Sequence, residues 1–163
     1  MLKTKEVIGA LNHHYNVNFS LGLEYAQLAH LVETKFKMPY AGKFLKTLST
    51  DKTGVHKDKL LTYFTTADIP LTSNIQYTAN NNEFDNALSV FEKVLANELA
   101  VRKELAEAAT AALQAQDYET FEFLQWFIKD GVKDYSDVQA VIDLITESNN
   151  TALADHLISE LEE

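Results

Sequence analysis

The clearest pattern in the chain lies in residues 4–36, TKEVIGALNHHYNVNFSLGLEYAQLAHLVETKF. One set of positions there recurs in alternating steps of four and three residues: Val7, Leu11, His14, Asn18, Leu21, Tyr25, Leu28 and Val32. This spacing places all of these side chains in one stripe along an α-helix. The segment therefore predicts a long amphipathic helix that buries one face against other helices.

Helical spacing also governs the rest of the chain. Residues 84–115 and 117–146 carry similar stripes, residues 41–66 carry a rougher one, and residues 150–162 predict a short fifth helix. Strand-like alternation is not found, and the 163 residues include only five glycines and two prolines, which argues against a turn-rich all-β protein. We therefore expect an all-α fold in one domain that spans residues 1–163.

The lengths of the links predict how the helices connect. Short links after the first and third helices make their neighbours antiparallel, whereas a polar stretch at residues 66–83, with Pro70 and Asn80-Asn81-Asn82, separates the second helix from the third. This link is long enough to run the length of a bundle. Four helices with one long crossover is the arrangement of ferritin-like folds.

Composition excludes several classes of function. The 24 acidic and 14 basic residues give a net charge of −10, which repels nucleic-acid backbones, and no cysteine is present for disulfides, thiolate metal sites or thiol catalysis. No apolar run reaches the ~18 residues that span a membrane, and the start of the chain shows no signal peptide. Met1 and Met38 are poorly placed as haem ligands. We expect a soluble cytoplasmic protein without haem.

Each stripe is interrupted near its centre by residues that do not suit a plain core. These are Asn18 in the first segment, Thr53 and His56 in the second, Glu98 and Arg102 in the third, and Gly131 in the fourth with Asp134 close by. Buried polar groups are costly unless they are paired. Four interruptions at similar depth predict one polar site shared between the helices.

A resemblance to a known family is carried by residues 117–127, DYETFEFLQWF, which are similar to the fourth-helix signature of bacterial non-haem ferritins. Residues 11–25 resemble the first helix of that family, and residues 56–64 resemble the end of its second helix. The resemblance runs over nearly the whole chain. It implies a subunit of a hollow twenty-four-subunit cage that stores iron, and a di-iron site of glutamates and Glu-x-x-His inside the bundle.

Carried over by resemblance, the di-iron site is degenerate in this chain. The ligand positions of the family fall on Asn18, Thr53, His56, Glu98, Gly131 and Asp134, so only His56, Glu98 and an outer Asp134 keep metal-binding groups. The match in the second helix needs a one-residue shift upstream of His56. Lys52 and Arg102 are placed to neutralise Glu98. Gly54 weakens the second helix by about 1 kcal/mol, and a kink there would spoil its metal-binding face.

These residues favour a cage subunit for iron storage or sequestration with ferroxidase activity weak or lost, similar to the light chains of animal ferritins, and leave open whether the chain is an enzyme. Glu98, His56 and Asp134 would bind iron loosely, and co-assembly with an active ferritin is an open partner hypothesis. The alternative is a structural or interaction protein whose interior holds an Arg102–Glu98 or Lys52–Glu98 pair, a core His56 and a solvated Asp134. A third reading, an active ferroxidase, requires Asp51 or Asp130 to turn inward.

Overall fold

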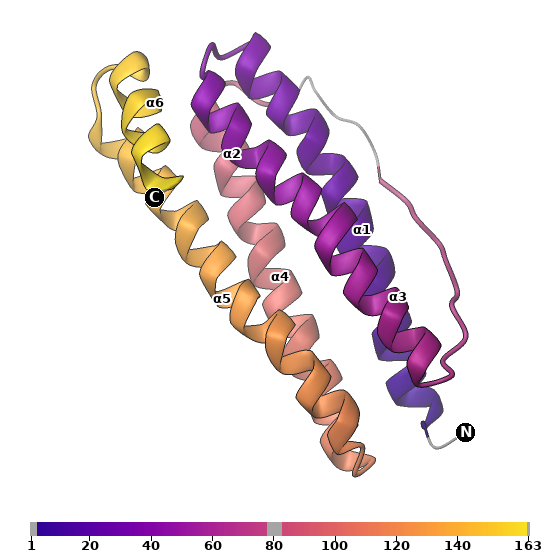
Figure 1. Ribbon diagram of the computed structural model, residues 1–163. Coiled ribbons are helices and arrows are strands. Elements are labelled where there is room, and N and C mark those ends of the chain that lie inside the picture. Colours follow the sequence, from indigo (N-terminus) through magenta and orange to yellow (C-terminus); the bar gives the residue numbers. More distant parts are fainter. Residues whose placement is uncertain (1–2, 78–82, 163) are drawn as a thin grey trace.

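Four long helical segments lie side by side, and a short helix closes one end of the bundle (Figure 1). The computed structural model describes residues 3–77 and 83–162. Its elements are α1 (Lys5–Thr34), α2 (Pro39–Thr50), the π-helical η1 (Asp51–His56), α3 (Lys57–Thr66), α4 (Ala87–Gln114), α5 (Tyr118–Glu147), α6 (Thr151–Ser159) and the 3₁₀ turn η2 (Glu160–Glu162). The second helix of the bundle is thus α2, η1 and α3 in succession.

This architecture confirms the predicted all-α bundle with a long crossover between its second and third helices and a short fifth helix. The third helix begins at Ala87 rather than near residue 84, because Asn86 caps it. The Asn86 side chain accepts a hydrogen bond from Ser89 N, and the Ser89 hydroxyl faces back to Asn86 N, which together form a capping box. The predicted Asn80-Asn81-Asn82 turn lies outside the described residues.

The apolar core consists of two clusters at opposite ends of the bundle. One surrounds Tyr25 and Phe91, and the other surrounds Leu11 and Leu124. Between the two clusters, the buried side chains are polar or charged. Among the residues that the structure describes, none of the helices combines the length and the apolar character needed to cross a membrane.

A close contact at Gly22 sets the separation of α1 from the second helix of the bundle. The Ser49 hydroxyl donates to Gly22 O at 2.6 Å, and a Cβ atom at Gly22 would lie 2.6 Å from the Thr53 methyl group and 3.2 Å from Lys52 Cβ. Only glycine leaves room for this approach. Because Asn18 lies one turn away on α1, the same contact brings the second helix close to Asn18.

The crossover lies along α1 and is held by side chains spaced four residues apart. Asn12 Nδ2 donates to Pro70 O at 3.0 Å, and Asn12 Oδ1 accepts from Thr72 N at 2.6 Å. Asn16 repeats the pattern with Thr72 O, at 2.7 Å, and with Asn74 N. Four residues of a helix rise about 6 Å and two extended residues about 6.6 Å, so one helix face can pair with alternate residues of an extended segment.

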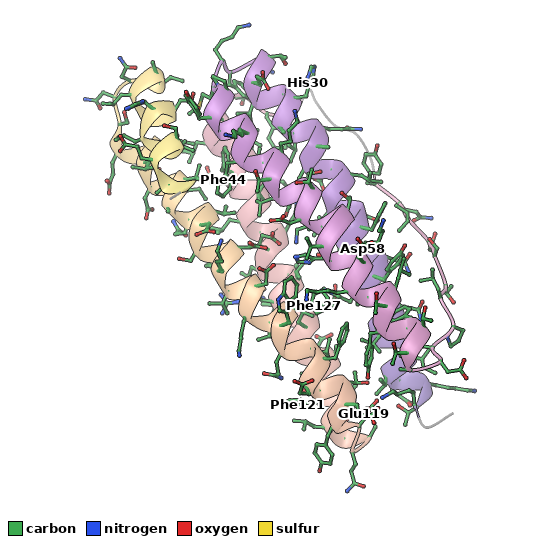
Figure 2. The ribbon with its side chains drawn as sticks, in the orientation of Figure 1. His30, Phe44, Asp58, Glu119, Phe121 and Phe127 are labelled. Atoms are coloured by element: carbon green, nitrogen blue, oxygen red, sulfur yellow. The ribbon has the colours of Figure 1, made fainter. Side chains whose placement is uncertain are left out.

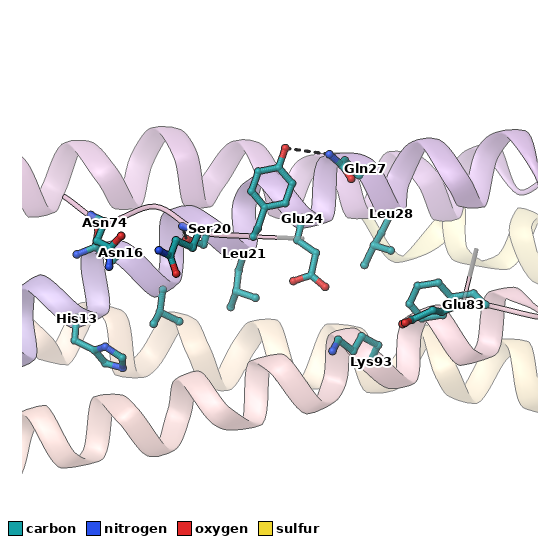
Figure 3. Close-up of a pocket in the computed structure, with 14 residues that line it drawn as sticks. His13, Asn16, Ser20, Leu21, Glu24, Gln27, Leu28, Asn74, Glu83 and Lys93 are labelled. Carbon is teal, nitrogen blue, oxygen red and sulfur yellow. Dashed lines mark hydrogen bonds between the residues drawn. The ribbon is translucent and has the colours of Figure 1, made fainter. Parts of the chain in front are cut away.

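A cleft of about 590 Å³ lies between α1, α4 and the crossover (Figure 3). Ser20 extends the asparagine series by accepting from Gln76 N at 3.3 Å, and Gln27 Nε2 donates to the Tyr77 hydroxyl at 3.0 Å. Asn16 and Asn74 lie at one end of this cleft, and Glu83 lies at the other.

The short α6 is attached to the bundle through a buried carboxylate. Asp155 accepts hydrogen bonds from Ala41 N at 2.8 Å and from Tyr40 N at 3.2 Å, both in the first turn of α2. A carboxylate at a helix N-terminus satisfies free backbone donors and is favoured by the helix dipole. Asp155 therefore fixes the terminal helix against the start of α2.

We expect Gly22→Ala to destabilise the fold by about 1–3 kcal/mol through overpacking, because the added methyl group would collide with Thr53. Gly9→Ala on the same helix is the matched control, since nothing lies within 4 Å of its Cβ position. That substitution should stabilise the helix by up to about 1 kcal/mol. Urea unfolding of both variants checks this, and equal shifts of the same sign would contradict it.

Candidate metal centre

The polar layer between the two core clusters draws on all four helices of the bundle. It contains Asn18 from α1, Lys52 and His56 from η1, Glu98 from α4, and Asp134 from α5, all of them buried. This arrangement is the shared interior site that the interrupted stripes predict. Lys52, one of the two cations that the sequence placed beside Glu98, lies at its centre.

Lys52 is the central cation of this layer. Its Nζ donates to Asn18 Oδ1 at 3.1 Å and lies 3.2 Å from Glu98 Oε1, and the Lys52 and Glu98 side chains are each only 3 % exposed. The contact with Glu98 is an ion pair that does not have the angle of a hydrogen bond. Among the described residues, Glu98 Oε1 has no hydrogen-bond partner. A cation therefore lies beside the one inner-site carboxylate that the chain retains.

The π-helical segment η1 explains why both Lys52 and His56 face the interior. A π turn contains about one more residue than an α turn, so side chains four residues apart stay on one face. The inward positions from Leu48 to Phe64 follow that step: Leu48, Lys52, His56, Leu60 and Phe64. This extra residue accounts for the one-residue shift in the sequence match and lies where Gly54 predicted a kink. In the sequence, the signal for this π-helical segment is the run of inward-facing residues spaced four apart.

The same geometry places Thr53 away from the centre of the layer. Its hydroxyl donates to Ser49 O at 3.0 Å, and its methyl group is the nearest atom to the Cβ position of Gly22. Lys52, rather than Thr53, thus lies at the interior position of the second helix. Gly131 also supplies no ligand, and the aliphatic part of Arg102 lies 3.7 Å from its Cβ position.

Three side chains on the α5 side of the layer converge as a metal site would require. Ligand atoms of His56, Asp130 and Asp134 all lie within 4.8 Å of one another. His56 Nε2 lies 2.8 Å from Asp130 Oδ2, and His56 Nδ1 lies 2.9 Å from Asn18 Nδ2. Because the Asn18 NH₂ group only donates, His56 Nδ1 accepts and Nε2–H donates to Asp130. An imidazole and two carboxylates suit a divalent cation of the iron, manganese or zinc type.

The two carboxyl groups of this cluster have unequal proton affinities. Burial, together with the negative charge of Asp130, raises the pKa of Asp134 to about 7. Burial acts in the same direction on Asp130, but the hydrogen bonds with His56 and Asp134 and the positive charge of Lys52 outweigh it and lower the pKa of Asp130. Asp130 is therefore the ionised partner, and a metal ion would displace the proton that Asp134 retains.

Aromatic side chains hold the imidazole of His56 in place. The His56 ring forms T-shaped contacts with the rings of Trp126 and Phe127, at centroid distances of 5.1 and 5.4 Å. Phe127, labelled in the middle of α5 in Figure 2, also contacts the His14 ring at 5.2 Å. The DYETFEFLQWF segment thus contributes packing that orients a polar residue.

The structure decides between several interpretations that the sequence left open. The predicted Arg102–Glu98 pair is replaced by Lys52–Glu98, while Arg102 lies over the Tyr135 ring at 5.1 Å. Asp134 is 7 % exposed, so it is buried within the subunit rather than solvated. Asp130 does turn inward, toward His56.

A buried His14–Glu104 pair had no signal in the sequence. His14 Nδ1 lies 2.7 Å from Glu104 Oε1, and the histidine ring is almost fully buried. Burial lowers the pKa of His14, and Glu104 only partly opposes this effect. The partner comes from α4 rather than from the next turn of α1, so spacing along one helix could not reveal it.

Comparison with known proteins places the chain in a family. The family profile described as "Ferritin-like domain" matches residues 8–148, and the chain therefore belongs to the ferritin-like family. An uncharacterized protein of Ureaplasma parvum serovar 3 is 39% identical over 158 residues, which cover 97% of this chain and 92% of the relative. A bacterial non-heme ferritin of Campylobacter jejuni is 26% identical over 97% of this chain and 95% of its own.

Solved structures agree with this fold. A ferritin of M. penetrans superposes with a TM-score of 0.88 at 24% identity and covers 98% of this chain and 97% of its own. An open pore ferritin from the archaeon Archaeoglobus fulgidus gives a TM-score of 0.87 at 19% identity, with 97% of both chains covered. At these identities the likeness concerns the fold.

The raised pKa of Asp134 predicts a pH dependence of stability. The unfolded pKa of an aspartate is about 3.9, and the folded value is about 7. The folded chain therefore binds more protons between these values, so the stability contributed by Asp134 is complete below about pH 4 and is lost as the pH rises toward about 7. Asp134→Asn should remove that loss.

Urea unfolding at about pH 5 and about pH 8 measures the effect. Relative to the unmodified protein, Asp134→Asn should be more stabilising at the higher pH. Asp137→Asn is the control, because its carboxylate is exposed and pairs with Lys133 at 2.6 Å. Parallel pH profiles for Asp134→Asn and the unmodified protein would contradict the assignment.

Proposed function

We propose that this chain is a cage-forming subunit of the ferritin family that stores or sequesters iron in the cytoplasm, with ferroxidase activity weak or lost. The observation that carries the proposal is the Lys52 ammonium in the interior of the bundle, 3.2 Å from Glu98. By resemblance, this interior is where the family holds two iron ions.

Electrostatics explains why oxidation of paired iron ions is disfavoured here. Two divalent cations held close together need a bridging carboxylate and further carboxylates to offset their charge. In this layer the inner carboxylate Glu98 already faces a lysine, and Asn18 accepts from the same ammonium. A metal ion at Glu98 would lie beside a fixed positive charge.

A single loosely held cation is compatible with the remaining groups. His56, Asp130 and Asp134 supply an imidazole and two carboxyl groups, and Asp134 lines a groove of about 510 Å³ between α2 and α5. Iron would bind transiently at this cluster, as a substrate for storage and not as a resident cofactor. Glu98, a ligand by resemblance, lies on the lysine side of the layer and would contribute only if Lys52 moved away.

Storage in this proposal belongs to the assembled cage. The net charge of −10 favours the accumulation of cations, and acidic residues that face an internal cavity would nucleate mineral. A subunit without an oxidation site benefits from a partner that supplies ferric iron, so co-assembly with an active ferritin belongs to the same proposal.

We expect light scattering on the iron-free protein to give a particle of roughly two dozen subunits, as the family resemblance implies. Ferrous iron should be oxidised slowly by this protein alone and be stored faster after co-assembly with an active ferritin. A monomer or dimer would leave no cavity to fill and would contradict storage. Rapid oxidation by the protein alone would contradict the loss of ferroxidase activity.

We expect anaerobic titration with Fe²⁺ or Co²⁺ to detect one weakly bound cation per subunit, because the buried Lys52 ammonium pairs with the carboxylate on the other side of the layer. His56→Ala and Asp134→Asn should abolish binding at this site. Asp137→Asn, one turn further along α5, should leave it unchanged. Two cations per subunit, or unaltered binding in both site variants, would contradict the assignment.

The alternative is a structural or interaction protein that binds no metal. It is favoured by the pairing already present, because Lys52 faces Glu98 and His56 donates to Asp130 without any ion. Under this alternative, the metal titration shows no binding and the native mass corresponds to a small oligomer.

A further inference from the structure

Four buried groups in the polar layer form a continuous series of contacts. Glu98 Oε1 lies 3.2 Å from Lys52 Nζ, Lys52 Nζ lies 3.1 Å from Asn18 Oδ1, and Asn18 Nδ2 lies 2.9 Å from His56 Nδ1. The Lys52 amine thus contacts the carbonyl oxygen of the Asn18 carboxamide, and a carboxyl group lies beside the amine. We propose that Lys52 and Asn18 form an intramolecular isopeptide bond with Glu98 as the catalytic residue.

The fold supplies the proximity that such a reaction needs. Reacting groups that a fold holds in contact gain an effective concentration far above any reachable in solution. Asn18 is 1 % exposed, and Lys52 and Glu98 are nearly as buried, so water does not compete for the amide. His56 holds Nδ2 of Asn18, which leaves the carbonyl end of the carboxamide facing Lys52. Asn18 and Lys52 come from α1 and η1, which the Gly22 contact brings together.

In this reaction, Glu98 accepts or donates the proton in every proton transfer. Its carboxylate takes a proton from the Lys52 ammonium, and the neutral pair avoids the cost of two buried charges. The amine lone pair then forms a bond to Cγ of Asn18, while Glu98 protonates Oδ1. Glu98 next takes a second proton from the attacking nitrogen and passes it to Nδ2. The Cγ–Nδ2 bond breaks, ammonia leaves, and the Oδ1 proton returns to Glu98 as the carbonyl re-forms.

The product removes one buried charge from the polar layer and supplies a hydrogen-bond donor for Glu98. A neutral amide replaces the buried ammonium, and the new N–H can donate to Glu98 Oε1, which now lacks a hydrogen-bond partner among the described residues. The bond also joins α1 covalently to the second helix of the bundle. The reaction converts the Lys52 ammonium, on which the proposed function rests, into a neutral amide at the same position, and it leaves the His56, Asp130 and Asp134 cluster in place.

Mass spectrometry of the folded full-length protein tests the proposal. After prolonged incubation, the intact mass should be lower than the mass of the sequence by one ammonia molecule. A tryptic digest should contain one joined peptide with residues 18 and 52 in its two branches, and no cleavage after Lys52. Protein recovered from inclusion bodies and kept in denaturant throughout should retain the full mass. An unchanged mass in the incubated folded protein would overturn the proposal.

Variants distinguish this bond from other losses of ammonia. Lys52→Arg, Asn18→Ala and Glu98→Gln should each retain the mass of their own sequence. Lys57→Arg is the matched control, because its ammonium lies on the same helix but faces solvent and Asp58. It should still lose one ammonia. A loss that persists in Lys52→Arg would overturn the proposal, and the unmodified protein decides the question if a variant does not fold.

Discussion

A charged ammonium group lies in the middle of this bundle, and its neighbours are arranged to compensate its charge. An unpaired buried charge is strongly destabilising, and removal of one partner from a buried ion pair typically costs about 3–5 kcal/mol. Lys52 meets this requirement with Glu98 from α4 and Asn18 from α1. These contacts require α1 and the second helix to approach closely, which the glycine at position 22 permits.

The polar layer is divided into two parts with different chemistry. On the α1 and α4 side, Lys52, Glu98 and Asn18 satisfy much of one another's charge and hydrogen-bonding capacity. On the α5 side, burial and the charge of Asp130 raise the pKa of Asp134 to about 7, and Asp134 lines a groove together with Asp137. Under the proposed function, the α5 side is therefore the half of the layer that would bind a cation.

Much of the architecture could be predicted from the sequence, because helical periodicity and link lengths depend on local spacing. The depth of Asn18, His56 and Glu98 also followed from their places in the stripes. The pairings could not be predicted, because they depend on how each helix is rotated about its axis. The π segment changes that rotation within the second helix, so the assumption of α periodicity pointed to Thr53 where Lys52 lies.

The asparagine series that holds the crossover also limits how this chain can change in length. Asn12 and Asn16 pair with alternate backbone positions from Pro70 to Asn74. Insertion of a single residue there would turn the backbone groups that follow away from α1, because an extended chain repeats every two residues. Insertion of two residues would restore the pairing. Natural or engineered length variants of this crossover are therefore expected to differ by even numbers of residues.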